Sequence, residues 1–68
     1  MTKYKVTHPA DGSEGFWIFE PAFLENYTTM RFCDGNGELR DYQIIKTKNV
    51  QKILDNAKAE GISVELVQ

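Results

Sequence analysis

The chain has 68 residues, which is enough for one domain with a small hydrophobic core. Hydrophobic residues make up 41% of the sequence and aromatic residues 12%, a composition that excludes a disordered chain. The formal net charge of −2 argues against a dedicated binder of duplex DNA or RNA, because such proteins need a basic face to neutralise phosphates.

The cellular compartment is predicted from cysteine usage and from the absence of long apolar segments. Cys33 is the single cysteine, so the chain forms no internal disulfide and needs no oxidising compartment. The first residues lack the apolar run of a signal peptide, and no stretch approaches the ~20 apolar residues of a membrane span. We therefore expect a cytoplasmic protein without membrane contact.

The first predicted element is a half-buried strand at residues 2–8. Tyr4 and Val6 alternate there with two lysines, so the apolar pair shares one face. A turn-rich loop follows at residues 9–15. The strand and this loop lead into a second strand with which the first can form a hairpin.

The second predicted strand, residues 16–20, is apolar on both faces. Phe16 and Ile18 share one face, and Trp17 and Phe19 share the other. Either the strand is buried on both sides or one aromatic face is exposed. Four residues are expected in the core: Phe16, Ile18, Phe32 and Leu54.

The segment after this strand, residues 21–26, reads PAFLEN and favours a single helical turn. Pro21 suits a first helical position, where its missing N–H costs nothing. Such a turn would stack Phe19 on Phe23, and Asn26 would end it.

The next two strands are predicted at residues 27–33 and 38–47, joined by the turn DGNG. Asp-Gly and Asn-Gly both provide the positive φ that primed hairpin turns require. Two apolar residues of each strand are expected to meet on one face: Met30 and Phe32 with Tyr42 and Ile44.

An amphipathic helix is predicted at residues 48–61, followed by a closing strand at 62–67. The apolar stripe of the helix has the spacing i, i+3, i+4 and i+7 and consists of Val50, Ile53, Leu54 and Ala57. Asn49 or Thr47 is the expected N-cap, and Gly61 the expected residue just past the helix end.

These elements predict an α+β fold of order β-β-β-β-α-β in one domain, residues 1–68. An antiparallel sheet of four to five strands with one helix on one face is the economical packing. The alternative is a small five-stranded barrel with the helix capping one end.

Charge is distributed unevenly along the chain. Residues 6–30 contain no Lys or Arg but four acidic residues, and they overlap the aromatic-rich stretch 14–27. Aromatic anchors with a charged rim are typical of protein interfaces. Six residues are therefore predicted to bind a partner: Glu14, Trp17, Phe19, Glu20, Phe23 and Glu25. Because one helix covers only one sheet face, at least one of the three aromatic residues in this set should be surface-accessible.

No sequence motif predicts catalysis, a metal or a cofactor. His8 with Asp11 and Glu14 is an unspecific set of ligands on a loop, and Cys33 lacks a neighbouring motif. A Cys33–His8 pair would need their two strands to be adjacent. The DGNG turn lacks the glycine and glutamate positions of a calcium loop, and no phosphate-binding glycine motif is present.

The sequence thus favours a non-enzymatic protein-interaction module, an adaptor, regulator or inhibitor of the kind found among short accessory proteins of phages and mobile elements. The expected partner is another protein with a basic surface, or a second copy of the chain. The alternative function is binding of single-stranded nucleic acid. Five basic residues would carry that alternative: Arg31, Arg40, Lys46, Lys48 and Lys52.

Overall fold

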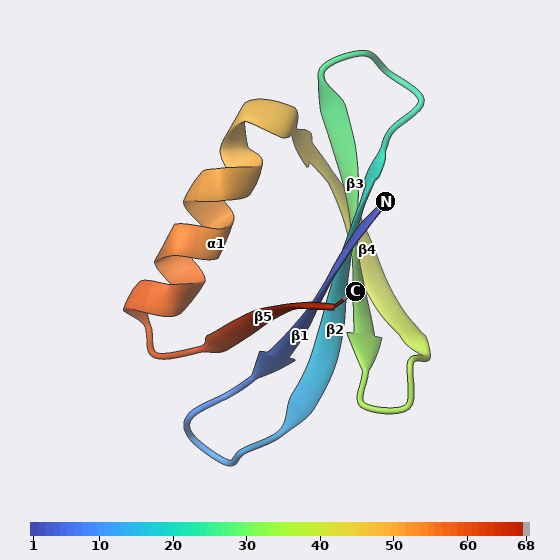
Figure 1. Ribbon diagram of the computed structural model, residues 1–68. Helices are drawn as coiled ribbons and strands as arrows, with labels where there is room; N and C mark the ends of the chain where they lie inside the picture. Colours follow the sequence, from blue (N-terminus) through green and yellow to red (C-terminus); the bar gives the residue numbers. More distant parts are fainter. Residues whose placement is uncertain (68) are drawn as a thin grey trace.

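The computed structural model describes residues 1–67 and is a five-stranded sheet with one helical segment. Its elements are β1 (Thr2–Thr7), β2 (Glu14–Pro21), β3 (Tyr27–Asp34), β4 (Leu39–Lys46), the 3₁₀ turn η1 (Thr47–Asn49), α1 (Val50–Ala59) and β5 (Ser63–Val67). The strand order is β4-β3-β2-β1-β5 and all neighbours are antiparallel (Figure 1).

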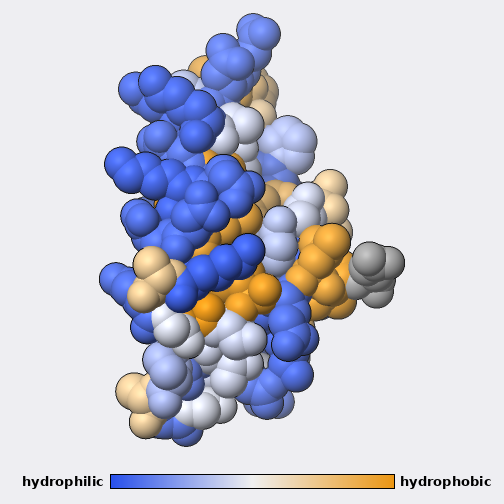
Figure 2. Space-filling view, turned by 60° about the vertical axis from the view of Figure 1, so that its left-hand side comes forward, coloured by the Kyte–Doolittle hydropathy of each residue, from blue (hydrophilic) through white to orange (hydrophobic). Residues whose placement is uncertain are grey.

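The predicted α+β architecture is confirmed, and the barrel alternative is wrong. β4 and β5 are the two edges of an open sheet, and α1 connects them across one face. Figure 2 views the molecule with the helix side turned forward: hydrophilic residues cover much of this face, and hydrophobic residues are visible between them and in a patch on the right. The sheet face away from α1, called the open face below, is not covered by any other element within residues 1–67.

The core lies between α1 and the middle of the sheet. Phe19, Met30 and Leu54 form its buried cluster, and half-buried apolar residues from the sheet and helix pack around them. Leu54 and Ala57 are buried, while Val50 and Ile53 lie at the margin. The predicted helical stripe is therefore the surface that seats α1 on the sheet.

Gly61 ends the helix as predicted. Its φ of +86° is a left-handed conformation that glycine adopts without a steric penalty. The N–H of Gly61 donates to the carbonyl of Lys58 at 3.0 Å, and that of Ile62 donates to Ala57 at 3.0 Å. This pair of bonds is a Schellman motif, which satisfies carbonyls that the helix end leaves free.

The two apolar faces of β2 are assigned differently from the prediction: the face expected in the core is the one that points away from the helix. Trp17 and Phe19 lie on the helix side, whereas Phe16 and Ile18 are half-buried on the open face. The prediction that Phe16 and Ile18 belong to the core is therefore wrong. The register decides this, because Trp17 pairs with Tyr4, whose face is the one that α1 covers.

A bulge between β3 and β4 reverses the expected facing of β4. Cys33 pairs with Leu39 but Phe32 pairs with Asp41, so one extra residue enters β4. A one-residue shift moves every later side chain to the other face. Met30 consequently pairs with Gln43, and the predicted meeting of Tyr42 and Ile44 with the Met30 face is wrong.

The loop between β2 and β3, residues 22–26, is not the helical turn that was expected. Pro21 still belongs to β2, and the N–H of Ala22 donates to the carbonyl of Tyr27 at 3.0 Å. Asn26 has a φ of +67°, which turns the chain back into β3. The asparagine thus closes a hairpin loop, a role for which its short polar side chain is suited.

Candidate interaction surfaces

The six residues predicted to bind a partner lie in three different places. Trp17 and Phe19 are on the helix side of β2. Glu14 and Glu20 are on its open face. Phe23 and Glu25 are in the loop at residues 22–26. The strand alternation separates neighbours in sequence, so the six do not form one continuous surface.

Two of the three aromatic candidates are engaged inside the fold. The Phe19 ring is only 6% exposed and meets Tyr4 edge-on, with 5.9 Å between ring centroids. Trp17 meets Phe32 edge-on at 6.1 Å. Such pairs add to the stability that burial alone gives. Phe23 is fully exposed, so the expectation that at least one of these aromatics is accessible is confirmed.

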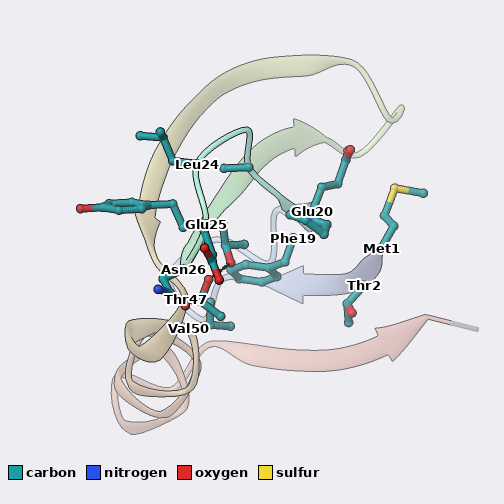
Figure 3. A pocket seen from close by; sticks show the side chains of 13 residues that line it. Met1, Thr2, Phe19, Glu20, Leu24, Glu25, Asn26, Thr47 and Val50 are labelled. Atoms are coloured by element: carbon teal, nitrogen blue, oxygen red, sulfur yellow. Dashed lines mark hydrogen bonds between the residues drawn. The ribbon is translucent and has the colours of Figure 1, made fainter.

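The loop borders an open hollow of about 550 Å³, called the loop hollow below, between the start of β1 and the start of α1. In Figure 3 the Phe19 ring lies within it, with Glu20 and Met1 to one side and Asn26, Thr47 and Val50 to the other. The Thr28 and Thr47 hydroxyls share a hydrogen bond of 2.8 Å that fixes β3 to η1. Thirteen residues line the hollow: Met1, Thr2, Phe19, Glu20, Pro21, Ala22, Leu24, Glu25, Asn26, Tyr27, Thr28, Thr47 and Val50.

The charged side chains at the loop hollow are acidic. None of its lining residues is Lys or Arg. Glu20 Oε1 lies 3.0 Å from Arg31 Nε across the open face, an ion pair in which the N–H is not aligned as a hydrogen bond. No ion pair within residues 1–67 involves Glu25. Of the two glutamates that line the loop hollow, Glu25 is therefore the one without an ion pair within residues 1–67.

The rim of the loop hollow carries three exposed apolar side chains. Met1, Phe23 and Leu24 are all largely solvent-accessible. Met1 and Leu24 line the hollow, and Phe23 precedes Leu24 in the chain. Apolar residues scattered singly on a surface are ordinary, but adjacent ones such as Phe23 and Leu24 at a hollow are typical of interaction sites.

The five basic residues of the nucleic-acid alternative are divided between two layers. Arg31, Arg40 and Lys46 belong to the sheet, whereas Lys48 and Lys52 belong to η1 and α1. Arg31 contacts Glu20, and Arg40 Nη2 lies 2.9 Å from Asp34 Oδ2. Two of the five cations are thus partly neutralised by carboxylates.

Lys46 and Lys48 nevertheless share a second hollow, called the lysine hollow below. It has a volume of about 570 Å³ and is lined by five residues: Asn26, Tyr27, Lys46, Thr47 and Lys48. The two hollows have Asn26, Tyr27 and Thr47 in common, so they adjoin at one end of the molecule.

The open face exposes two apolar residues that the sequence placed against the core. Tyr42 is 61% exposed and Ile44 is 56% exposed, because the bulge turned them outward. No residue in this part of the sequence predicts a bulge, so the outward position of these two side chains could not be predicted.

The structure does not assemble the chemical groups weighed from the sequence. β2 lies between β1, which leads to His8, and β3, which holds Cys33, so the adjacency that a Cys–His pair requires is absent. Within residues 1–67 no three His, Cys, Asp or Glu side chains are grouped to hold a metal ion.

Asp34 has a structural role at the β3–β4 turn. Its Oδ1 accepts the N–H of Asn36 at 2.9 Å and of Glu38 at 3.0 Å, and Oδ2 accepts Arg40 Nε at 3.1 Å. The hydrogen bond from Glu38 N–H is the main reason that the pKa of Asp34 lies below its usual value, with Arg40 contributing less.

Comparison with known proteins identifies no relative of this chain. No protein-family model, curated protein or solved structure matches it. No helix within residues 1–67 is long and apolar enough to cross a membrane.

Proposed function

We propose that the protein is a non-enzymatic interaction module that docks another protein at the loop surface, defined as Phe23, Leu24 and Glu25. The observation that carries this proposal is the fully exposed Phe23, which lies in sequence between Ala22 and Leu24, two residues that line a hollow whose charged side chains are acidic. Aromatic anchors surrounded by polar groups dominate the energy of many interfaces.

The chemistry of the loop surface favours a partner segment with an apolar side chain next to a basic one. The apolar side chain would enter the loop hollow above Phe19, against Leu24. The basic side chain would pair with Glu25, which has no ion pair within residues 1–67. Charge complementarity of this kind raises the association rate and selects among partners.

A pair of matched double variants tests the docking surface. Phe23→Ala/Leu24→Ala removes the apolar rim, whereas Leu39→Ala/Tyr42→Ala removes two exposed apolar residues from β4. Each variant is immobilised beside the wild type, and the proteins retained from native-host extract are quantified. We expect one or more proteins to be retained by the wild type and the β4 variant but lost from the loop variant.

A further variant and a size measurement complete the test. Glu25→Gln should weaken retention of the same proteins, and higher salt should do so too, because an exposed ion pair is screened. Light scattering across protein concentrations shows whether a second copy is the occupant, in which case Phe23→Ala/Leu24→Ala should shift the chain to monomer. Equal retention by the wild type and the loop variant, with unchanged mass, would refute docking at this surface.

A further inference from the structure

The lysine hollow is lined by two lysines and one aromatic residue. Tyr27 and Lys46 are cross-strand partners at the ends of β3 and β4, so their side chains lie on the same face of the sheet. Lys48 follows two residues later in η1 and lines the same hollow. One tyrosine and two lysines from different elements therefore line one hollow.

Backbone contacts hold this arrangement in place. The N–H of Thr47 donates to the carbonyl of Asn26 at 2.9 Å, which ties the exit of β4 to the entry of β3. Asn26 keeps its left-handed conformation at the same point. The backbone at Lys46 and Lys48 is thus held beside Tyr27 by the β3–β4 pairing and by this hydrogen bond at the start of η1.

The two lysines retain their charge for a ligand. No ion pair within the described part of the chain involves Lys46 or Lys48, whereas Lys5, Arg31 and Arg40 all contact carboxylates. Two ammonium groups without carboxylate partners favour a doubly charged anion such as a phosphate monoester.

The neighbouring Tyr27 ring and Asn26 amide narrow the class of anion. A half-buried ring offers a stacking surface for a planar group, and a side-chain amide can both donate to and accept from the edge of a base. The volume of about 570 Å³ is in the range of small-molecule sites, which are roughly 300–1,000 Å³.

We propose that the lysine hollow binds a 5′-nucleotide, with the phosphate between Lys46 and Lys48 and the base on Tyr27. This chemistry is shared by a free mononucleotide and by the 5′-phosphorylated end of a single strand. The site is separate from the docking surface, because Phe23, Leu24 and Glu25 do not line it.

Nuclear magnetic resonance titration of the isotope-labelled protein tests the proposal. The probes are AMP and UMP, compared with adenosine and with inorganic phosphate. We expect both nucleotides to shift the backbone signals of residues 26–27 and 46–48, with a Kd on the order of 1 mM or tighter. Adenosine and phosphate alone should each bind at least about fivefold more weakly, because each keeps only one of the two contacts.

Charge-matched variants separate this site from general attraction to a basic protein. Lys46→Gln/Lys48→Gln should weaken AMP binding at least about fivefold, whereas Lys3→Gln/Lys58→Gln, with the same change in net charge, should not. Tyr27→Leu should weaken binding and Tyr27→Phe should restore it, because phenylalanine keeps the stacking ring.

A trinucleotide with and without its 5′-phosphate distinguishes the two ligand sources. If the phosphorylated form binds at least as tightly as AMP, the ligand is a strand end; if AMP binds more tightly, the ligand is a free nucleotide. The proposal is overturned by equal losses in the two double variants, by shifts confined to other residues, or by no shifts at ~10 mM AMP, ten times the expected Kd. The proposal is also overturned if the trinucleotide binds equally tightly with and without its 5′-phosphate.

Discussion

Truncation of Leu54 to alanine should remove a large part of the stability of this domain. Leu54 is 5% exposed and belongs to the buried cluster with Phe19 and Met30, so the change leaves a cavity between helix and sheet. Buried Leu→Ala changes cost about 2–5 kcal/mol, and the value includes both lost transfer energy and the cavity. We expect about 3 kcal/mol here, because the small core can relax only partly around the gap.

That loss is large relative to the total stability of 68 residues. At roughly 0.05–0.15 kcal/mol per residue, the whole domain is stable by about 3–10 kcal/mol. A domain of this size loses about 4–8 °C in Tm for each kcal/mol, so Leu54→Ala should lower the Tm by about 12–24 °C.

Urea denaturation followed by circular dichroism and by Trp17 fluorescence measures the effect. Lys52→Ala is the matched control, because Lys52 is exposed on the same helix and its loss should change stability by less than about 0.5 kcal/mol. The reasoning fails if Leu54→Ala costs less than about 1 kcal/mol or if the two variants behave alike. Either result would mean that α1 is not seated on the sheet through Leu54.

Three further changes probe the sheet and its turns. Gly15→Ala should destabilise the domain by about 1–3 kcal/mol in the same assay, because the new Cβ would lie 2.6 Å from the backbone carbonyl oxygen of Cys33. Thr28→Val should cost about 1 kcal/mol in urea denaturation, because it removes the hydrogen bond to the Thr47 hydroxyl. Asp34→Asn should lower the Tm at pH 7, because folding lowers the pKa of the wild-type carboxylate and the charged form therefore stabilises the fold. The Tm difference should shrink as the pH falls below about 4, because the wild-type carboxylate then becomes protonated and no longer stabilises the fold. A Tm difference independent of pH would contradict this.

The helix and its end could be predicted because their signals are local. The apolar spacing from Val50 to Ala57 fits only one period, and Gly61 supplies a left-handed residue where the helix must end. The helix and its end both depend on residues within two helical turns of one another, so they do not depend on how the strands pair. The alternation of Tyr4 and Val6 with lysines was equally local and also held.

The facing of β2 and β4 could not be predicted, because it depends on pairing partners far along the chain. β2 is apolar on both faces, and only its register with β1 assigns Phe19 to the core. A regular hairpin would have placed Met30 opposite Tyr42, but the bulge adds one residue and places Gln43 there. A single inserted position therefore decided which side of β4 faces solvent.

The candidate binding residues could not be grouped correctly from the sequence for the same reason, because their positions depend on strand pairing. The aromatic-rich stretch is one segment in sequence, but Trp17 and Phe19 lie on the helix side of β2, whereas Phe23 lies beyond the strand in the exposed loop. The lysine hollow combines Tyr27 with Lys46 and Lys48, about twenty positions later. Only the β3–β4 register brings them together, so no local pattern could have shown this site.

The two hollows adjoin, so the docking proposal and the nucleotide proposal are best distinguished by changing the charge of single side chains. Salt weakens both a Glu25–cation pair and a lysine–phosphate contact, so salt dependence alone cannot tell them apart. Side-chain charge can, because Glu25 lines only the loop hollow, whereas Lys46 and Lys48 line only the lysine hollow. Removing the negative charge with Glu25→Gln should weaken a basic partner but should not weaken a nucleotide, since it takes away a repulsive neighbour. Loss of both ligands in that variant would instead indicate that the loop at residues 22–26 has changed shape, and the hydrogen bond from Thr47 N–H to Asn26 would be the first contact to examine.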